Sequence, residues 1–192
     1  MKFAPRVLAI AAALQLFTMA SPSAGAAETH PFSTPPAVRN GQHDFDFLVG
    51  QWKLHNRRLR KPLSGSHDWY EFNGVSRANA IWDGRGVLEF VHFAAPKHPI
   101  DGLGIHFYDA RTGQWSQYWA TPSEGLSPIP NVGSFNAAGV GVLIDRETVN
   151  GRAIMTRYRW THGPRTAHWE QAFSQDGGKT WEVNWTTDYT RA

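Results

Sequence analysis

The tripeptide Gly50-Gln51-Trp52 constrains the fold more than any other feature, because it stands between a short apolar turn at residues 44–48 and a chain that is strand-like to its end. The last strand-like stretch ends in Arg191. A guanidinium stacked on an indole can cover one end of a barrel. We therefore expect an all-β fold, a closed antiparallel barrel whose first and last strands meet at Trp52 and Arg191.

The rest of the chain shows the alternation of apolar and polar residues that is typical of strands. Turns rich in glycine, aspartate and asparagine separate the segments, and none is long enough for the helix that connects parallel strands. The pattern predicts an up-and-down barrel of about ten strands. The strand-like segments are residues 52–57, 69–72, 87–93, 103–108, 115–120, 133–136, 140–148, 152–160, 166–174 and 180–190.

Two connections are expected at the ends of this barrel. Residues 44–48 predict one short helical turn with Asp44 or Asp46 as its N-cap, and its two phenylalanines and its leucine are expected to plug one end. Residues 121–130 contain three prolines and one glycine, so we expect a long loop over one barrel mouth.

The start of the chain has the form of a secretory signal peptide. Lys2 and Arg6 precede an apolar run at residues 7–19, and residues 24–26 have the small-x-small form that a signal peptidase cuts. The chain is therefore divided into a signal peptide, a flexible lead-in rich in proline, serine and threonine, and a barrel domain, at residues 1–26, 27–42 and 43–192.

Composition narrows the location and the partners. The chain has no cysteine, so its stability must come from buried apolar area, which nine tryptophans, eleven phenylalanines and five tyrosines supply. An exported chain without cysteine fits a bacterial periplasm or secretion from a bacterium. Loss of Lys2 and Arg6 with the leader lowers the formal net charge from +3 to +1, so nothing indicates nucleic-acid binding. No later stretch approaches the ~20 apolar residues of a membrane span.

The expected pairing of Trp52 with Arg191 resembles the signature of lipocalins and other calycins, in which the tryptophan of a Gly-x-Trp on the first strand packs under an arginine from the last. Residues 43–52, 109–115 and 169–174 are similar to a family of uncharacterised bacterial calycin-like proteins. The resemblance implies a barrel that holds a small apolar ligand. It implies no reaction, because a shared fold does not carry a shared activity.

Residues 174–181 match the pattern Ser-x-Asp-x-Gly-x-Thr-Trp and so resemble the Asp-box of sialidase propellers. A propeller repeats its blades at a steady period, whereas this pattern occurs once. We therefore expect a structural hairpin turn in which Asp176 accepts hydrogen bonds from turn amides.

The search for catalytic motifs is negative, because the chain lacks a Gly-x-Ser-x-Gly elbow, a Walker-type glycine loop, a His-Glu-x-x-His sequence and any cysteine. His92, His98 and His106 have spacings that match no metal template, so we expect solvent-facing histidines and no metal. Some small calycin-like barrels of the nitrobindin type hold haem through one histidine. His168 or His106 is the candidate here, although neither carries the surrounding motif of that family.

The last strands leave two predictions for the barrel interior open, since a shift of one residue exchanges the two faces. One register points a polar row inward, consisting of Thr166, His168, Glu170, Glu182, Asn184 and Asp188. The other points an aromatic row inward, consisting of Trp169, Gln171, Phe173, Trp181, Val183 and Trp185. We favour the aromatic row and an outer charged face for Arg157 and Arg159, because an inward arginine beside Glu170 is costly unless it serves a ligand.

The preferred function is an exported binding protein that holds a small apolar or amphipathic ligand in an aromatic-lined barrel. The alternatives are an enzyme with Glu170 or His168 as general acid or base, a haem-binding barrel, and a structural barrel with a filled core. Apart from the haem alternative, no cofactor is implied. The candidate ligand-binding residues are Trp119, Arg157, Trp169, Glu170, Asn184 and Trp185.

Overall fold

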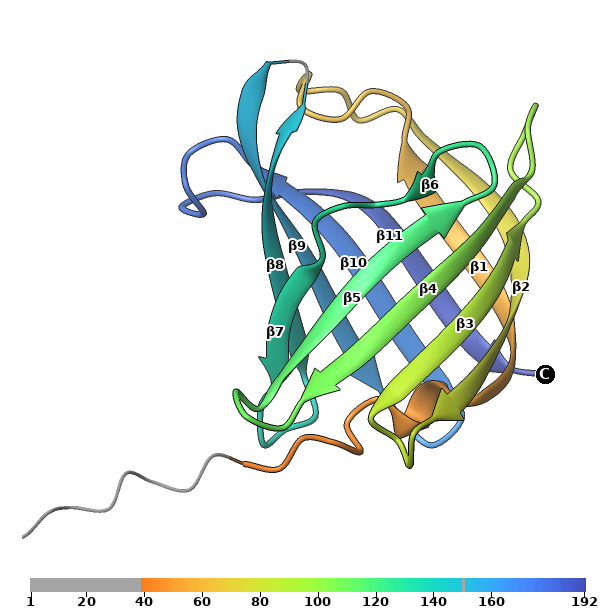
Figure 1. Ribbon diagram of the computed structural model, residues 1–192. Coiled ribbons are helices and arrows are strands. Elements are labelled where there is room, and N and C mark those ends of the chain that lie inside the picture. Colours follow the sequence, from red (N-terminus) through yellow and green to blue (C-terminus); the bar gives the residue numbers. More distant parts are fainter. Residues whose placement is uncertain (1–38, 150) are drawn as a thin grey trace, which may run out of the picture. The chain divides into compact units, whose positions relative to one another are not determined.

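The computed structural model describes residues 39–149 and 151–192, which include a single β-barrel (Figure 1). The predicted signal peptide and residues 27–38 of the predicted lead-in lie outside the described residues. Within the described part, no helix is long and apolar enough to cross a membrane. The elements are the 3₁₀ turn η1 (Asp46–Leu48) and the strands β1 (Gly50–Leu59), β2 (Trp69–Ile81), β3 (Gly86–Phe93), β4 (Ile100–Asp109), β5 (Gln114–Thr121), β6 (Gly125–Leu126), β7 (Asn131–Phe135), β8 (Gly141–Val149), β9 (Arg152–His162), β10 (Thr166–Ser174) and β11 (Glu182–Arg191).

Antiparallel pairing joins the strands into a closed ring. Their order is β4-β3-β2-β1-β11-β10-β9-β8-β7-β5-β6, and an additional pairing of β4 with β5 closes the sheet. Ten strands form the ring, whereas β6 only pairs with the end of β5. The structure therefore confirms the predicted all-β, up-and-down barrel.

Two elements differ from the predicted segments. Strand β2 extends far beyond residues 69–72, because β1 pairs with residues 69–78 and β3 pairs with residues 74–81. Local propensity alone does not predict this extension, since residues 73–80 hold few strand-forming side chains. Within the predicted loop at residues 121–130, Gly125 and Leu126 form the short strand β6.

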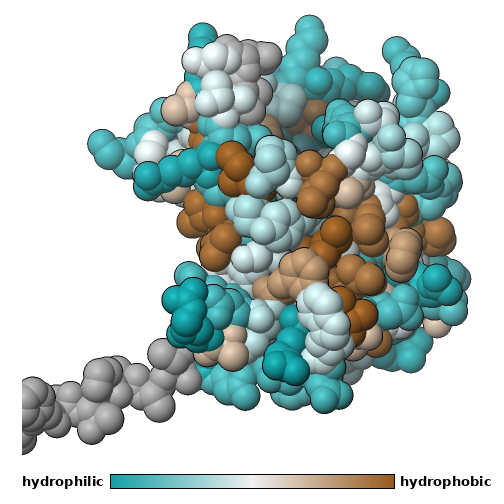
Figure 2. All heavy atoms as spheres, viewed as in Figure 1, coloured by the Kyte–Doolittle hydropathy of each residue, from teal (hydrophilic) through white to brown (hydrophobic). Residues whose placement is uncertain are grey.

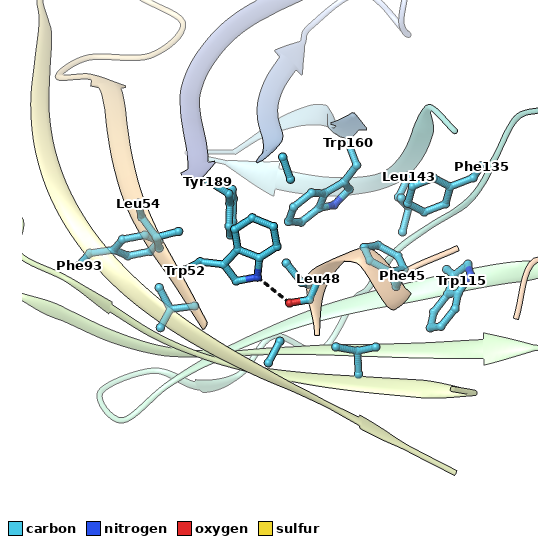
Figure 3. Close-up of a cluster of buried hydrophobic side chains, with 14 of the residues drawn as sticks. Phe45, Leu48, Trp52, Leu54, Phe93, Trp115, Phe135, Leu143, Trp160 and Tyr189 are labelled. Atoms are coloured by element: carbon cyan, nitrogen blue, oxygen red, sulfur yellow. Dashed lines mark hydrogen bonds between the residues drawn. The ribbon is translucent and has the colours of Figure 1, made fainter. Parts of the chain in front are cut away.

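The first and last strands meet as predicted. Trp52 of β1 lies opposite Arg191 of β11, and the guanidinium carbon stands 3.9 Å from the centre of the indole ring. The same guanidinium donates to the carbonyl oxygens of Val49, at 2.6 Å, and of Phe47, at 2.7 Å. Trp52 Nε1 donates to the Leu48 carbonyl at 2.7 Å (Figure 3). The pair therefore joins the two strands and also binds the carbonyl groups at the end of η1.

The 3₁₀ turn plugs the end of the barrel that this pair covers. Phe45 and Leu48 are fully buried, and the Phe45 ring lies 4.9 Å from both Trp115 and Phe135, centre to centre (Figure 3). Trp115 also donates through Nε1 to the carbonyl of Gly41, at 2.9 Å. Aromatic packing against the neighbouring strands β5 and β7 therefore holds the turn in place.

The predicted N-cap of this turn is wrong. Phe45 occupies the N-cap position, and neither aspartate caps the turn through its side chain. The Asp44 carboxylate pairs instead with Arg39, and the Asp46 carboxylate lies 2.9 Å from His43 Nδ1. A turn of three residues that is buried by its apolar side chains does not depend on a cap.

The hairpin between β10 and β11 confirms the predicted role of Asp176. Its carboxylate accepts hydrogen bonds from the Thr180 hydroxyl, at 2.6 Å, and from the amides of Thr180 and Lys179, both at 3.0 Å. These hydrogen bonds, the Thr180 hydroxyl first, lower the pKa of Asp176. The turn is stabilised locally and lies away from the barrel interior.

Replacement of Gly50 tests the closure of the barrel. Gly50 has a φ of +125°, and a Cβ there would overlap Arg191 Nη1. We expect Gly50→Ala to lower the free energy of unfolding by more than about 2 kcal/mol in urea titrations. Gly65→Ala is the matched control, because Gly65 also has a positive φ, +71°, but has open space around it. A loss of about 1 kcal/mol in the free energy of unfolding is expected for this variant. Equal losses in the two variants would contradict the proposed contact.

Trp52→Ala tests the same closure from the other partner. Trp52 is 2% exposed, and truncation of a buried tryptophan costs about 3–5 kcal/mol. Trp82→Ala serves as the control, because Trp82 is 64% exposed and a loss below about 1 kcal/mol is expected. Urea unfolding measures both variants. A Trp52→Ala protein as stable as the wild type refutes the anchoring role.

Candidate functional site

A cavity of about 90 Å³ lies inside the barrel, next to the plug. Most of its wall is aromatic, and the rings come from β3, β5, β9, β10 and β11. Neighbouring rings contact each other, with centres 5.0 Å apart for Tyr158 and Trp169 and 5.6 Å apart for Trp169 and Trp185. The aromatic residues of the wall are Phe93, Trp119, Tyr158, Trp160, Trp169, Trp185 and Tyr189.

Several polar side chains in this wall are satisfied by hydrogen bonds within the protein. Gln117 Oε1 accepts from Trp160 Nε1 at 3.0 Å, and Gln171 Nε2 donates to Asn184 Oδ1 at 2.7 Å. The Thr187 hydroxyl donates to Asn56 Oδ1 at 2.7 Å. These groups serve the fold, because buried polar atoms are normally paired.

Glu89 is the exception in the wall. It stands on the inward row of β3 and is 4% exposed, yet its Oε1 has no hydrogen-bond partner among the described residues. Burial raises the pKa of Glu89 to about 7, and the nearby hydroxyls of Ser76 and Tyr189 offset this only in part. The Ser76 hydroxyl itself forms no hydrogen bond to any residue that the structure describes. The cavity therefore contains an acid that changes charge near neutral pH.

His106 lies beside this acid, behind the cavity wall. The residue is completely buried, its ring centre stands 4.5 Å from that of Phe45, and neither ring nitrogen has a partner within the described part of the chain. Burial lowers the pKa of His106 to about 3, so the ring is neutral at physiological pH. The prediction of a solvent-facing side chain is therefore wrong for His106, although His92 and His98 are exposed.

Gly104 keeps the space between these two groups open. A Cβ on this residue would lie 3.3 Å from His106 Nε2 and 3.5 Å from Glu89 Oε2. Both unsatisfied side chains therefore approach one point on the wall of the cavity. Any residue other than glycine would place a side chain there.

Two further acids face the interior from β8. Asp145 and Glu147 alternate with the buried Leu143, and the charges of both raise the pKa of Tyr158, although burial contributes most. Burial, together with the charge of Glu147, raises the pKa of Asp145 to about 6. Thr156 donates to Glu147 at 2.5 Å, whereas Asp145 Oδ1 is unpaired among the residues described. This side of the interior is therefore negative.

A wider hollow of about 460 Å³ lies outside the cavity, against residues 121–124 of the predicted mouth loop. Trp119 and Trp185 line both the cavity and the hollow, so these two indoles stand between them. Arg58 also lines the hollow, and its guanidinium carbon lies 4.3 Å from the centre of the Trp185 ring. A molecule that passes from the hollow to the cavity therefore contacts Trp119 and Trp185.

The structure brings some of the predicted ligand-binding residues together. Trp119, Trp169 and Trp185 line the cavity. Asn184 is 1% exposed and reaches the cavity only through its hydrogen bond to Gln171. In the predicted aromatic row, Trp169, Gln171 and Trp185 line the cavity, whereas Phe173, Trp181 and Val183 do not. A bulge opposite Gln171 and Ala172 shifts the first residues of β11 relative to β10.

The other predicted site residues lie away from the cavity. Arg157 and Glu170 form an ion pair at 2.9 Å, and Arg157 also stacks on Trp181 at 4.7 Å. His168 pairs with Asp188 at 2.7 Å. Since Trp169 and Gln171 point inward, the alternating residues 168 and 170 point outward. Neither Glu170 nor His168 reaches the cavity as a general acid or base.

A haem does not fit this interior. His106 is packed against the plug, His168 is paired with Asp188 on the other face of the sheet, and the cavity of about 90 Å³ is too small for the macrocycle. Within the described ranges, no group of three or more histidine, cysteine, aspartate or glutamate side chains is arranged to hold a metal ion.

Sequence reasoning missed Glu89, Tyr158 and Tyr189. The signal for Glu89 was its place in the row Val87, Glu89, Val91 and Phe93, where one acid interrupts apolar residues. On β4 the pattern misleads, because His106 points inward while Leu103, Ile105 and Phe107 are only partly buried on the outer face. Figure 2 shows apolar residues on this outer surface, where Phe90 is 46% exposed.

No protein-family model matches the chain, and no curated protein shows significant sequence similarity to it. The geometry of the cavity therefore carries the functional interpretation.

Glu89→Gln tests the pKa of the buried acid. The pKa of Glu89 is raised in the folded state from 4.5 to about 7, so the native state binds more protons and stability falls as pH rises between these values. Relative to the Glu89→Gln variant, the free energy of unfolding of the wild type is expected to fall by about 3 kcal/mol between about pH 4 and about pH 8. Urea unfolding of both proteins measures this difference. Both proteins contain His106 and Asp145, so the contributions of these two groups cancel. A difference that does not change with pH contradicts the raised pKa.

Proposed function

We propose that the protein binds a small amphipathic molecule inside the barrel. The observation that carries this proposal is the buried Glu89 carboxyl, whose Oε1 has no partner among the described residues within an aromatic-walled cavity. An unsatisfied buried polar group costs about 1–3 kcal/mol, and a barrel that served only as a structural element would gain stability by losing it. A ligand that supplies the missing partner accounts for its presence.

The size of the cavity indicates how such a molecule is placed. About 90 Å³ is less than the ~150 Å³ cavity that holds a benzene molecule, so the cavity accepts only a small polar end group with a few carbon atoms. The remainder of the ligand extends past Trp119 and Trp185 into the outer hollow of about 460 Å³. Apolar parts then contact the indole faces, and the polar end reaches Glu89.

The cellular location of the protein and its relationship to other barrel proteins belong to the same proposal. Residues 1–26 have the form of a signal peptide, which supports export to a bacterial periplasm or beyond. The contact between Trp52 and Arg191 supports a relationship to the calycin-like barrels, in which the interior holds the ligand. The protein thus acts as an exported small-molecule binding protein.

A second candidate is an enzyme in which Glu89 acts as the general acid or base. The pKa of about 7 that burial gives this carboxyl favours the role, because proton transfer is most efficient when the pKa lies near the working pH. In this alternative, Glu89 takes the role of general acid or base that the sequence suggested for Glu170 or His168. An enzyme converts the bound molecule, whereas a binding protein releases it unchanged, so mass spectrometry of the ligand after incubation separates the two.

A ligand screen by tryptophan fluorescence and thermal shift tests the binding function. Short alcohols, amines and carboxylic acids with aliphatic or aromatic ends are expected to change the emission and raise the melting temperature. Trp169→Phe, in the cavity wall, is expected to lose much of the emission change. Trp181→Phe, which removes an indole outside the cavity, is the matched control and keeps it. A panel without any shift in the wild type refutes the proposal.

A further inference from the structure

The cavity wall contains an acidic side chain but no basic one among the described residues. Among the described residues that line the cavity, Glu89 is the only carboxylate, and none is a lysine, an arginine or a histidine. Buried charges in proteins are normally paired with an opposite charge. The ionised carboxylate of Glu89 therefore has no counter-ion in the wall.

Groups that face Glu89 from the neighbouring elements do not supply a positive charge. Ser76 of β2 offers only a hydroxyl, and the pKa of His106 of β4, about 3, keeps that ring neutral. Tyr189 of β11 stays protonated, because burial and the charge of Glu89 both raise its pKa. Tyr158 of β9 is likewise neutral, and the acids of β8 near it, which include Asp145, add negative charge. The interior therefore favours a cation.

The aromatic wall favours the same kind of ligand. The faces of tryptophan and tyrosine rings attract cations, and the attraction is stronger where water is excluded. Trp119, Trp160, Trp169 and Trp185 line the cavity that contains Glu89. Arg58 already shows this contact at the mouth, where it stacks on Trp185 at 4.3 Å.

We propose that the ligand carries a primary or secondary ammonium group, which donates a hydrogen bond to the Glu89 carboxylate inside the aromatic wall. This inference rests on the proposed binding function and names its ligand class. An ammonium that carries N–H bonds offers the ionised Glu89 carboxylate both an opposite charge and a hydrogen-bond donor. A quaternary ammonium lacks the donor, and a neutral alcohol lacks the charge.

The proposal predicts a characteristic dependence on pH. The ammonium binds the ionised carboxylate, and the pKa of Glu89 in the free protein is about 7. The ionised fraction therefore rises about tenfold between about pH 6 and about pH 8, and the affinity for an amine rises with it. At about pH 6 binding is expected to release about one proton, whereas at about pH 8 it releases almost none.

Isothermal titration calorimetry of the full chain with n-butylammonium, 1-butanol and tetramethylammonium tests this inference. We expect n-butylammonium to bind at least about tenfold more tightly than either other probe at about pH 8. Buffers of different ionisation enthalpy count the protons released. Glu89→Gln is expected to lose the preference for the amine and the dependence on pH while it still binds 1-butanol. Glu170→Gln, which removes an acid outside the cavity, is the matched control and keeps both properties.

The outcomes separate this inference from the function on which it rests. Equal binding of amine and alcohol, or amine binding that is tighter below pH 7, overturns the ammonium assignment and leaves the binding function standing. Absence of binding for all three probes, together with a negative ligand screen, overturns both. The comparison of probes and the pH series use the wild type alone, so a Glu89→Gln protein that does not fold leaves the test intact.

Discussion

The contact between Trp52 and Arg191 is the interaction on which the rest of the structure depends. It joins the first strand to the last and binds the carbonyl oxygens of the turn before β1. Ring closure leaves no long unpaired edge, and in a chain without cysteine it must be held by hydrogen bonds and aromatic packing. Closure also decides which side chains share an interior, because opposite walls come together only when the ring is complete.

The polar side chains of this interior differ in whether they have hydrogen-bond partners. Phe45 of the plug packs among buried aromatic side chains of the core. In the cavity wall, Gln117 and Gln171 are satisfied by neighbours, whereas Glu89 Oε1 has no partner among the described residues. Unsatisfied buried groups lower stability, and Glu89 lies in the wall of the cavity, so the proposed ligand would meet this carboxyl group.

Charge is distributed differently on the two faces of the barrel wall. Arg157 pairs with Glu170 away from the cavity, where partial exposure to solvent reduces the cost of both charges. Glu89 lies inward without a positive partner among the described residues that line the cavity. A paired acid with access to solvent serves the surface, whereas an unpaired buried acid is kept at a cost. The proposed binding function accounts for this cost.

Alternation, turn residues and the Gly-x-Trp sequence were sufficient to predict the barrel, its approximate strand number, the Asp176 turn and the meeting of Trp52 with Arg191. Whether a residue points inward was decided by the tertiary structure, since a period of two leaves either face open. The apolar row of β4 lies on the outer face, so His106 is buried, and a bulge opposite Gln171 and Ala172 shifts the first residues of β11. The site around Glu89 exists only because distant strands enclose it, and the sequence of one strand does not record what the opposite wall contributes.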